Sequence, residues 1–138
     1  AGPSMVLDSV ELGAEGARSG GFHALHASGF EWRADVREEY GWIGEAMGSW
    51  VEFKVTGSSV TIGFLKSYEH MGRATVYLDG VPDATVDALS VGGASQLAEH
   101  TLLPAAAGEH VLRIEIAKSS PARVENKFKL LRVAMRGL

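Results

Sequence analysis

The chain has 138 residues, of which 46% are hydrophobic and 22% charged, with a formal net charge of −4 and no cysteine. This length fits one domain whose hydrophobic core is large enough to be stable without a disulfide or a structural metal. The lack of cysteine excludes disulfides and thiolate metal sites. Because the 13 basic residues are scattered and outnumbered by 17 acidic ones, we expect no nucleic-acid partner.

The first five residues, AGPSM, read as a cloning remnant or linker, and we predict one β-sandwich domain over residues 6–138. No segment has the basic, apolar and small-residue pattern of a signal peptide. The longest apolar run is far below the ~20 residues that span a bilayer, so no membrane span is expected.

The region before Trp50 is the least regular part of the chain. Short strand-like pieces are separated by glycines, as in GFHALHASGFEWRADV. The next stretch, VREEYGWIGEAMG, leaves room for a brief helical turn, although Gly41, Gly44 and Gly48 argue against a long helix.

Strand signals dominate from Trp50 onward, with apolar and polar residues in alternation. Apolar residues repeat at every second position in SWVEFKV and again in VTIGFLK, a pattern typical of half-buried strands. The residues TGSS between them favour a turn. We therefore predict that these two strands form a β-hairpin.

Three further strands are predicted in the second half. ATVYLDG ends in Asp79-Gly80, a strong turn signal. HVLRIEI alternates its apolar and charged residues and follows the Pro and Gly of a turn. In the closing KFKLLRVAMR, alternation places Phe128 and Leu130 on one face and Val133 and Met135 on the other.

The strand pattern as a whole defines the predicted fold class. About eight to ten short strands, with turn signals every 8 to 12 residues, indicate an all-β protein built as an antiparallel β-sandwich or barrel. Crossover-length helices are missing between the strands, which disfavours a doubly wound fold. We predict a jelly roll, in which two antiparallel sheets pack face to face.

The stretch FLKSYEHMGRATVYLDG contains the strongest candidate ligand site. Tyr68 offers an aromatic plate, and Glu69, His70 and Arg73 offer charged hydrogen bonds to hydroxyl groups. Binding residues concentrate on loops that rigid strands hold in place. The alternative is a purely structural crossing, in which Glu69 pairs with Arg73 and His70 is solvated.

A second candidate feature is the aromatic segment with Trp32, Tyr40, Trp42 and Trp50. Exposed aromatic rings near carboxylates stack on the apolar faces of sugars, so Trp42 joins the predicted ligand-binding residues. The alternative is a core role, because tryptophan is large and mostly buried. Trp50 lies on the strand face opposite the apolar residues.

Metal and catalytic signatures are weak. His23 and His26 have a spacing that puts them on opposite faces of a strand, and zinc needs three or four convergent ligands. We predict no metal site, with Ca²⁺ as the cation that loop carbonyls and carboxylates would still allow. The chain has no G-x-S-x-G, Walker or H-E-x-x-H motif.

The order of four segments resembles a known domain family. GSWVEFKV, GFLKSYEHMGRATVYLDG, LLPAAAGEHVLRIEI and KFKLLRVAMR are together similar to the jelly-roll domain that accompanies SGNH-type hydrolases and carbohydrate esterases. The resemblance covers about Gly48 to Arg136 and implies a carbohydrate-related accessory module. The hydrolase nucleophile motif Gly-Asp-Ser is absent, since the only Asp-Ser, Asp8-Ser9, lacks the glycine, so esterase activity is not implied.

These observations favour a non-catalytic module that binds a glycan or polysaccharide, or that sits beside a catalytic domain in the same chain. One alternative is a structural or protein-interaction sandwich that docks a neighbour through an apolar patch or sheet edge. A small hydrolase using Glu69 and His70 as acid and base ranks last. The FLKSYEHMG segment is similar to a variant found in extracellular or Golgi proteins, so we expect a secreted or Golgi-lumenal location.

Overall fold

The computed structural model describes residues 9–13, 24–34, 40–67, 71–90, 95–106, 108–117 and 126–136, which form strands and turns. One sheet contains β1 (Ser9–Gly13), β3 (Phe30–Ala34), β4 (Tyr40–Gly44), β6 (Ser59–Lys66), β9 (Gln96–Leu102) and β11 (Phe128–Arg136). The other contains β2 (His26–Ser28), β5 (Trp50–Thr56), β7 (Arg73–Leu78), β8 (Val81–Asp87) and β10 (Glu109–Ala117).

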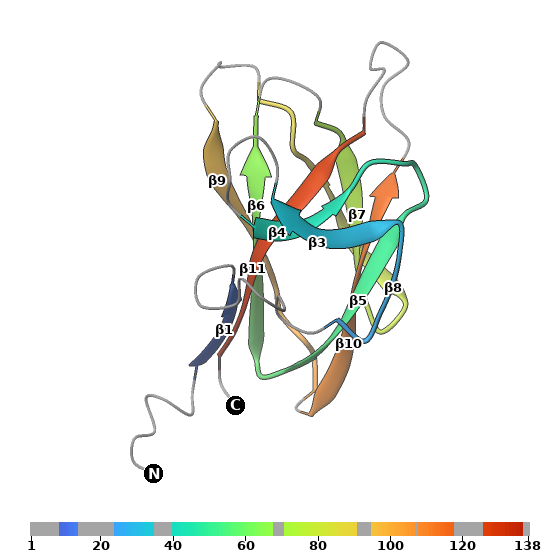
Figure 1. The fold of residues 1–138 in the computed structure, drawn as a ribbon. Coiled ribbons are helices and arrows are strands. Elements are labelled where there is room, and N and C mark those ends of the chain that lie inside the picture. The colour runs from blue at the N-terminus through green and yellow to red at the C-terminus, as the bar shows by residue number, and fades with distance from the viewer. Residues whose placement is uncertain are drawn as a thin grey trace.

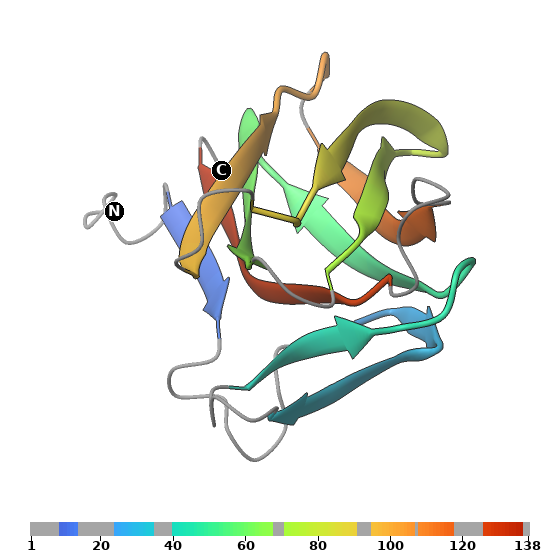
Figure 2. The same cartoon turned by 90° about the horizontal axis from the view of Figure 1, so that it is seen from above.

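The two sheets pack as the layers of a sandwich (Figures 1 and 2). The six-stranded sheet has the order β3-β4-β11-β6-β9, with β1 beside β11, and the five-stranded sheet has the order β2-β5-β10-β7-β8. All strand pairs within the sheets are antiparallel. From β5 onward the chain passes repeatedly from one sheet to the other. The predicted all-β jelly roll is therefore confirmed.

Alternation of residue type explains why the strands bury one face. On β10, Leu112 and Ile114 are fully buried, and in the register they stand opposite Phe53 and Val51 of β5. The residues between them, including Arg113, lie on the outer face. Since successive side chains of a strand point to opposite sides, a two-residue repeat is enough to assemble this part of the core.

The predicted hairpin of β5 and β6 is wrong, although both strands and the turn between them exist. β5 pairs with β2 and β10, whereas β6 pairs with β9 and β11. Gly57 has a φ of 112°, which glycine adopts readily and other residues rarely do. The turn therefore carries the chain across the core into the opposite sheet, where each strand finds its partners.

The predicted faces of β11 are wrong for its second half. Val133 and Met135 face the core together with Phe128 and Leu130, because the pairing of β11 with β6 shifts between Leu130 and Arg132. The shift adds one residue to β11, and a β-bulge of this kind reverses the faces of the residues that follow it. Both halves of the strand can then bury apolar residues.

The predicted turn at Asp79-Gly80 is confirmed. Asp79 has a φ of 53° and Gly80 a φ of 82°, and these two residues join the paired strands β7 and β8. Positive φ at both central positions is the geometry of a type I′ hairpin turn. Asp79 also accepts a hydrogen bond from the backbone N–H of Val111 at 2.8 Å, which ties the turn to β10.

The brief helical turn allowed before Trp50 is absent from Tyr40–Gly44, which is strand β4. A Cβ atom on Gly44 would lie 2.7 Å from the ring of Phe30 and 3.0 Å from Ile116, so glycine lets β4 approach the core closely. The described residues contain no helix long and apolar enough to cross a membrane. Residues 1–5 lie outside them, so their assignment stays a prediction.

Candidate functional site

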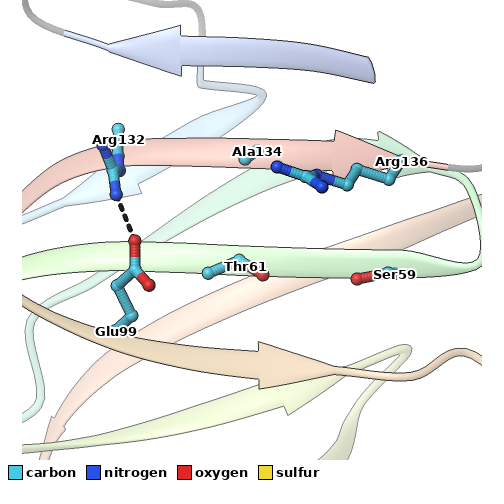
Figure 3. Close-up of a pocket in the computed structure, with 6 residues that line it drawn as sticks. All are labelled: Ser59, Thr61, Glu99, Arg132, Ala134 and Arg136. Carbon is cyan, nitrogen blue, oxygen red and sulfur yellow. Dashed lines mark hydrogen bonds and ion pairs between the residues drawn. The ribbon is translucent and has the colours of Figure 1, made fainter. Parts of the chain in front are cut away.

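A polar groove lies on the outer face of the six-stranded sheet (Figure 3). It has a volume of about 200 Å³ and crosses three adjacent strands, β11, β6 and β9. Its lining residues share an outward position on these strands: Ser59, Thr61, Glu99, Arg132, Ala134 and Arg136. We refer to this hollow as the outer groove.

One side of the outer groove is formed by an ion pair that spans β6. Arg132 on β11 and Glu99 on β9 both stand opposite Gly63 of β6 in the strand registers, and the Arg132 guanidinium donates to the Glu99 carboxylate. A Cβ on Gly63 would lie 2.8 Å from Cγ of Arg132 and 3.0 Å from its Nε. Glycine at this position therefore lets the arginine side chain cross the strand.

The floor of the outer groove consists of small side chains. Ala134 of β11 pairs with Thr61 of β6, which in turn pairs with Thr101 of β9. The two threonine Oγ1 atoms are 2.8 Å apart and hydrogen-bonded. Small residues in the row beside the Arg132–Glu99 pair leave a depression where long side chains would otherwise fill the space.

Arg136 and Ser59, which pair across β11 and β6, close the far end of the outer groove. Figure 3 shows the side chain of Arg136 lying along β11 toward Ala134, so its guanidinium group reaches over the floor. Outward rows of a sheet are separated by about 6.6 Å along the strand. Arg132 and Arg136 are two rows apart, so their backbone positions are separated by roughly 13 Å.

The chemistry of the outer groove is that of hydrogen bonding. Guanidinium groups only donate, a carboxylate only accepts, and hydroxyl groups do both. This mixture suits a ligand rich in hydroxyl groups. The residues lining the groove include no aromatic ring, so a sugar would be held there by polar contacts and not by stacking.

Three of the four predicted aromatic residues lie in a row on the β3–β4 hairpin. Trp32 stacks on Tyr40 with ring centroids 6.0 Å apart, and its other neighbour is Trp42 at 5.9 Å in an edge-on arrangement. Trp42 also meets the buried Phe53 at 6.2 Å. Trp42 is thus half-buried, with Trp32 of the same hairpin on one side and Phe53 of the core on the other. This placement agrees with the alternative core role for this residue.

Trp50 belongs to a different surface. It lies on the outer face of the five-stranded sheet, as its place in the alternation predicted, and the guanidinium carbon of Arg113 sits 4.3 Å above its ring. Arg113 also pairs with Glu52 at 3.1 Å and Glu115 at 2.9 Å. The aromatic set of the sequence is therefore divided between two sheets.

Of the residues predicted for the loop site, only Arg73 belongs to the part of the chain that the structure describes. Tyr68, Glu69 and His70 lie outside the described residues, so their role stays a prediction. Arg73 lies on the outer face of β7, where it pairs with Asp87 of β8 at 3.5 Å. Trp42 is on the other sheet, so among the described residues these two predicted ligand-binding side chains do not share a surface.

His110 has a structural role at the β7–β8 turn. Its Nδ1 is 2.6 Å from Asp79 Oδ2 and its Nε2 is 2.7 Å from the carbonyl oxygen of Ala106. The Asp79 carboxylate, helped by this carbonyl, raises the pKa of His110, and the same hydrogen bond lowers the pKa of Asp79. The contacts of both ring nitrogens with oxygen atoms favour the doubly protonated imidazolium, and they leave neither nitrogen open to act on a substrate as a general base.

The described residues contain no group of three or more histidine, aspartate or glutamate side chains that converge on one point. A protein calcium site requires six to eight oxygen ligands, mainly carboxylates and carbonyls. The described part of the chain therefore offers no such carboxylate cluster, and calcium binding stays a prediction.

The comparisons with known proteins concern the fold. No family model and no curated protein sequence matches the chain. Among solved structures, a two-domain esterase active on acetylated mannans and co-crystallised with mannopentaose superposes with a TM-score of 0.72 at 17% identity. The match covers 94% of this chain but 36% of the esterase, so this chain spans little more than a third of that protein's length.

Two separate binding modules match over nearly their whole length. The CBM36-1 domain of a multidomain xylanase from the hindgut metagenome of Trinervitermes trinervoides has a TM-score of 0.62 at 12% identity, with 95% of this chain and 98% of that domain covered. A CBM36 module in complex with calcium and xylotriose has a TM-score of 0.59 at 11% identity, with 90% and 97% covered. The chain thus has the jelly-roll fold of carbohydrate-binding modules, which confirms the resemblance at the level of fold.

None of the residues that line the outer groove was predicted as a ligand-binding residue from the sequence. Ser59, Thr61 and Gly63 occupy the outward positions of a strand whose inward residues are apolar, and this alternation was visible. The partners of that strand were not visible, and Arg132 and Glu99 reach the groove only because β11 and β9 flank β6. A site built across three strands leaves no local sequence signal.

Proposed function

We propose that this chain is a non-catalytic carbohydrate-binding module and that the outer groove is its glycan site. The observation that carries the proposal is the row of hydrogen-bonding side chains along the outer face of β6, open to solvent and backed by a rigid sheet. Sites on strands hold their side chains in place, so little ordering free energy is lost when a ligand binds.

The structural neighbours support this assignment. The neighbours whose whole length matches are carbohydrate-binding modules, and one of them was crystallised with xylotriose. Two described histidines contact a carboxylate: His110 has both ring nitrogens engaged, and His100, which lies 2.8 Å from Asp83, does not line the outer groove. A binding role therefore accounts for the described chemistry better than a hydrolytic one.

We further propose that a catalytic domain accompanies this module in a longer chain, as in the two-domain esterase of which the match covers 36%. A module that binds polysaccharide would hold such an enzyme near its substrate and raise the local substrate concentration. A secreted or Golgi-lumenal location fits this role, and localisation of a tagged full-length protein tests it.

Two matched threonine variants test the glycan site. Thr61 and Thr75 each share a hydroxyl–hydroxyl hydrogen bond with a cross-strand threonine, at 2.8 Å and 3.1 Å, but they lie on the outer faces of opposite sheets. Thr61→Val should weaken binding of a glycan identified on an array by roughly fivefold, the effect of one hydrogen bond. Thr75→Val should leave the affinity unchanged.

The array screen is run with and without Ca²⁺, and titration calorimetry measures the variants against the glycan that binds. Equal affinity in both variants would remove the outer groove as the site. Failure to bind any glycan in either buffer would contradict the module assignment and favour the structural or protein-interaction alternative. Loss of binding only when Ca²⁺ is withdrawn would establish the cation as a cofactor.

A further inference from the structure

We propose that the outer groove selects an acidic glycan and that Arg136 binds the carboxylate of a uronic-acid residue. This inference rests on the proposed glycan-binding function and adds the chemical class of the ligand. Among the described residues, Arg136 is the one arginine without a carboxylate partner. The other four are paired as follows: Arg33 with Glu31 and Glu45, Arg73 with Asp87, Arg113 with Glu52 and Glu115, and Arg132 with Glu99.

Arg136 lines the outer groove, so its guanidinium group, which has no carboxylate partner among the described residues, is available to a ligand there. The Arg136 side chain lines the groove and extends along β11 toward Ala134, so the guanidinium group points toward the end of the groove at which Arg132 and Glu99 pair (Figure 3). A guanidinium group presents parallel N–H donors that match the two oxygens of a carboxylate. A carboxylate bound at this end would therefore be held in two places by one side chain.

The charges of the lining side chains favour an anion over a neutral sugar. Arg132 is neutralised by Glu99, so the six lining residues carry one uncompensated positive charge, that of Arg136. The hydroxyl groups of Ser59 and Thr61 lie beside it on β6 and can bind the ring hydroxyls of the same or the next sugar. A uronic acid offers both chemistries in one residue, which a neutral hexose or a bare anion does not.

The direct test compares two polymers that differ only at the carboxyl group of each sugar. Polygalacturonate carries a carboxylate on every sugar, and its fully methyl-esterified form is neutral. The chain should bind the acid form at least tenfold more tightly than the ester at low salt, and the preference should shrink as NaCl is raised because salt screens exposed charges. Arg136→Gln should remove the preference, and Arg136→Lys should retain part of it, because lysine keeps the charge but not the fork of donors.

Lys54→Gln is the matched control, because it makes the same charge change on the outer face of the five-stranded sheet, where Lys54 pairs with Glu109. This variant should keep the preference for the acid form. Polyglutamate tests attraction to negative charge alone, and binding as tight as that of polygalacturonate would overturn the inference.

The remaining outcomes separate the inference from the function on which it rests. Equal affinity for acid and ester forms, or binding of neutral array glycans only, would overturn the acidic ligand and leave the module assignment standing. Binding of no glycan at all would overturn both. A preference for acid that survives in Arg136→Gln would show that another group binds the carboxylate and would reject the role of Arg136.

Discussion

The side chain of Arg132 crosses strand β6 above Gly63 and pairs with Glu99, so one ion pair links three neighbouring strands on the outer face of the sheet. The pair is partly exposed, with 31% of the Arg132 side chain accessible, and exposed ion pairs contribute little to stability. Its main effect is to fix the position of Arg132 at the edge of the outer groove.

Gly63→Ala should separate binding from stability. The new Cβ would lie 2.8 Å from Cγ of Arg132, which forces the arginine off the strand and away from Glu99. Replacing a strand glycine also removes backbone entropy from the unfolded chain, so the free energy of unfolding should change by less than about 1 kcal/mol. Glycan affinity should fall several-fold in calorimetry, and unchanged affinity would show that Arg132 does not contribute.

Gly80→Ala should destabilise the protein without any steric clash. The φ of Gly80 is 82°, and no heavy atom beyond Gly80 and its two chain neighbours lies within 4 Å of the position that a Cβ would occupy. Alanine in a left-handed conformation costs roughly 1–2 kcal/mol. Urea unfolding followed by tryptophan fluorescence measures the change. Gly63→Ala serves as the comparison at a residue without positive φ, and a smaller loss at Gly80 than at Gly63 would contradict the type I′ assignment.

The stability of the fold should depend on pH through the His110–Asp79 pair. Asp79 and the Ala106 carbonyl raise the pKa of His110, so this contribution is complete below about pH 6.5, the ordinary value for histidine, and is lost as the pH rises through the raised pKa. The pKa of Asp79 is lowered, so its contribution is complete above about pH 4 and lost as the pH falls through the lowered pKa.

Thermal unfolding between pH 3 and pH 9 tests this dependence. The Tm should be highest between about pH 4 and pH 6.5. Asp79→Asn retains a residue that tolerates positive φ but removes the charge, so the decline above pH 6.5 should flatten in this variant. An identical pH profile in Asp79→Asn and the parent chain would show that other groups cause the decline.

Trp42→Ala and Trp50→Ala should differ in their effect on stability. Trp42 packs against the buried Phe53 and against Trp32, so its loss should cost about 3 kcal/mol, the lower end of the range for large aromatic residues in cores. Trp50 lies under Arg113 on the outer face, where a cation–π contact is worth about 0.5–1 kcal/mol. Urea midpoints measure both, and equal losses would contradict the half-buried placement of Trp42.

Some features could be read from the residues in order along the chain. The faces of β5 and β10 follow from simple alternation, and each buried residue predicted on them is buried in the structure. The turn at Asp79-Gly80 was predicted from two residues, because both tolerate positive φ better than other residue types. These features are local, since they depend on neighbours within a few positions.

Other features depend on contacts between distant residues. β5 and β6 alternate as two strands of a hairpin would, yet they lie in opposite sheets. The bulge after Leu130 is likewise invisible in KFKLLRVAMR, because it exists only in the register of β11 against β6. A pairing partner is chosen by the packing of the whole sandwich, and that choice is not encoded in any single strand.

The candidate site shows the same division. Alternation alone placed Thr61 and Gly63 on the outward side of a strand, whereas Ser59 belonged to the predicted turn TGSS. Arg132 and Glu99 are 33 positions apart in the chain. They meet because β6 lies between their two strands and has a glycine, Gly63, at the point where the arginine side chain crosses it. A two-residue repeat determines which way each side chain points, whereas the order of strands in the sheet determines which side chains become neighbours.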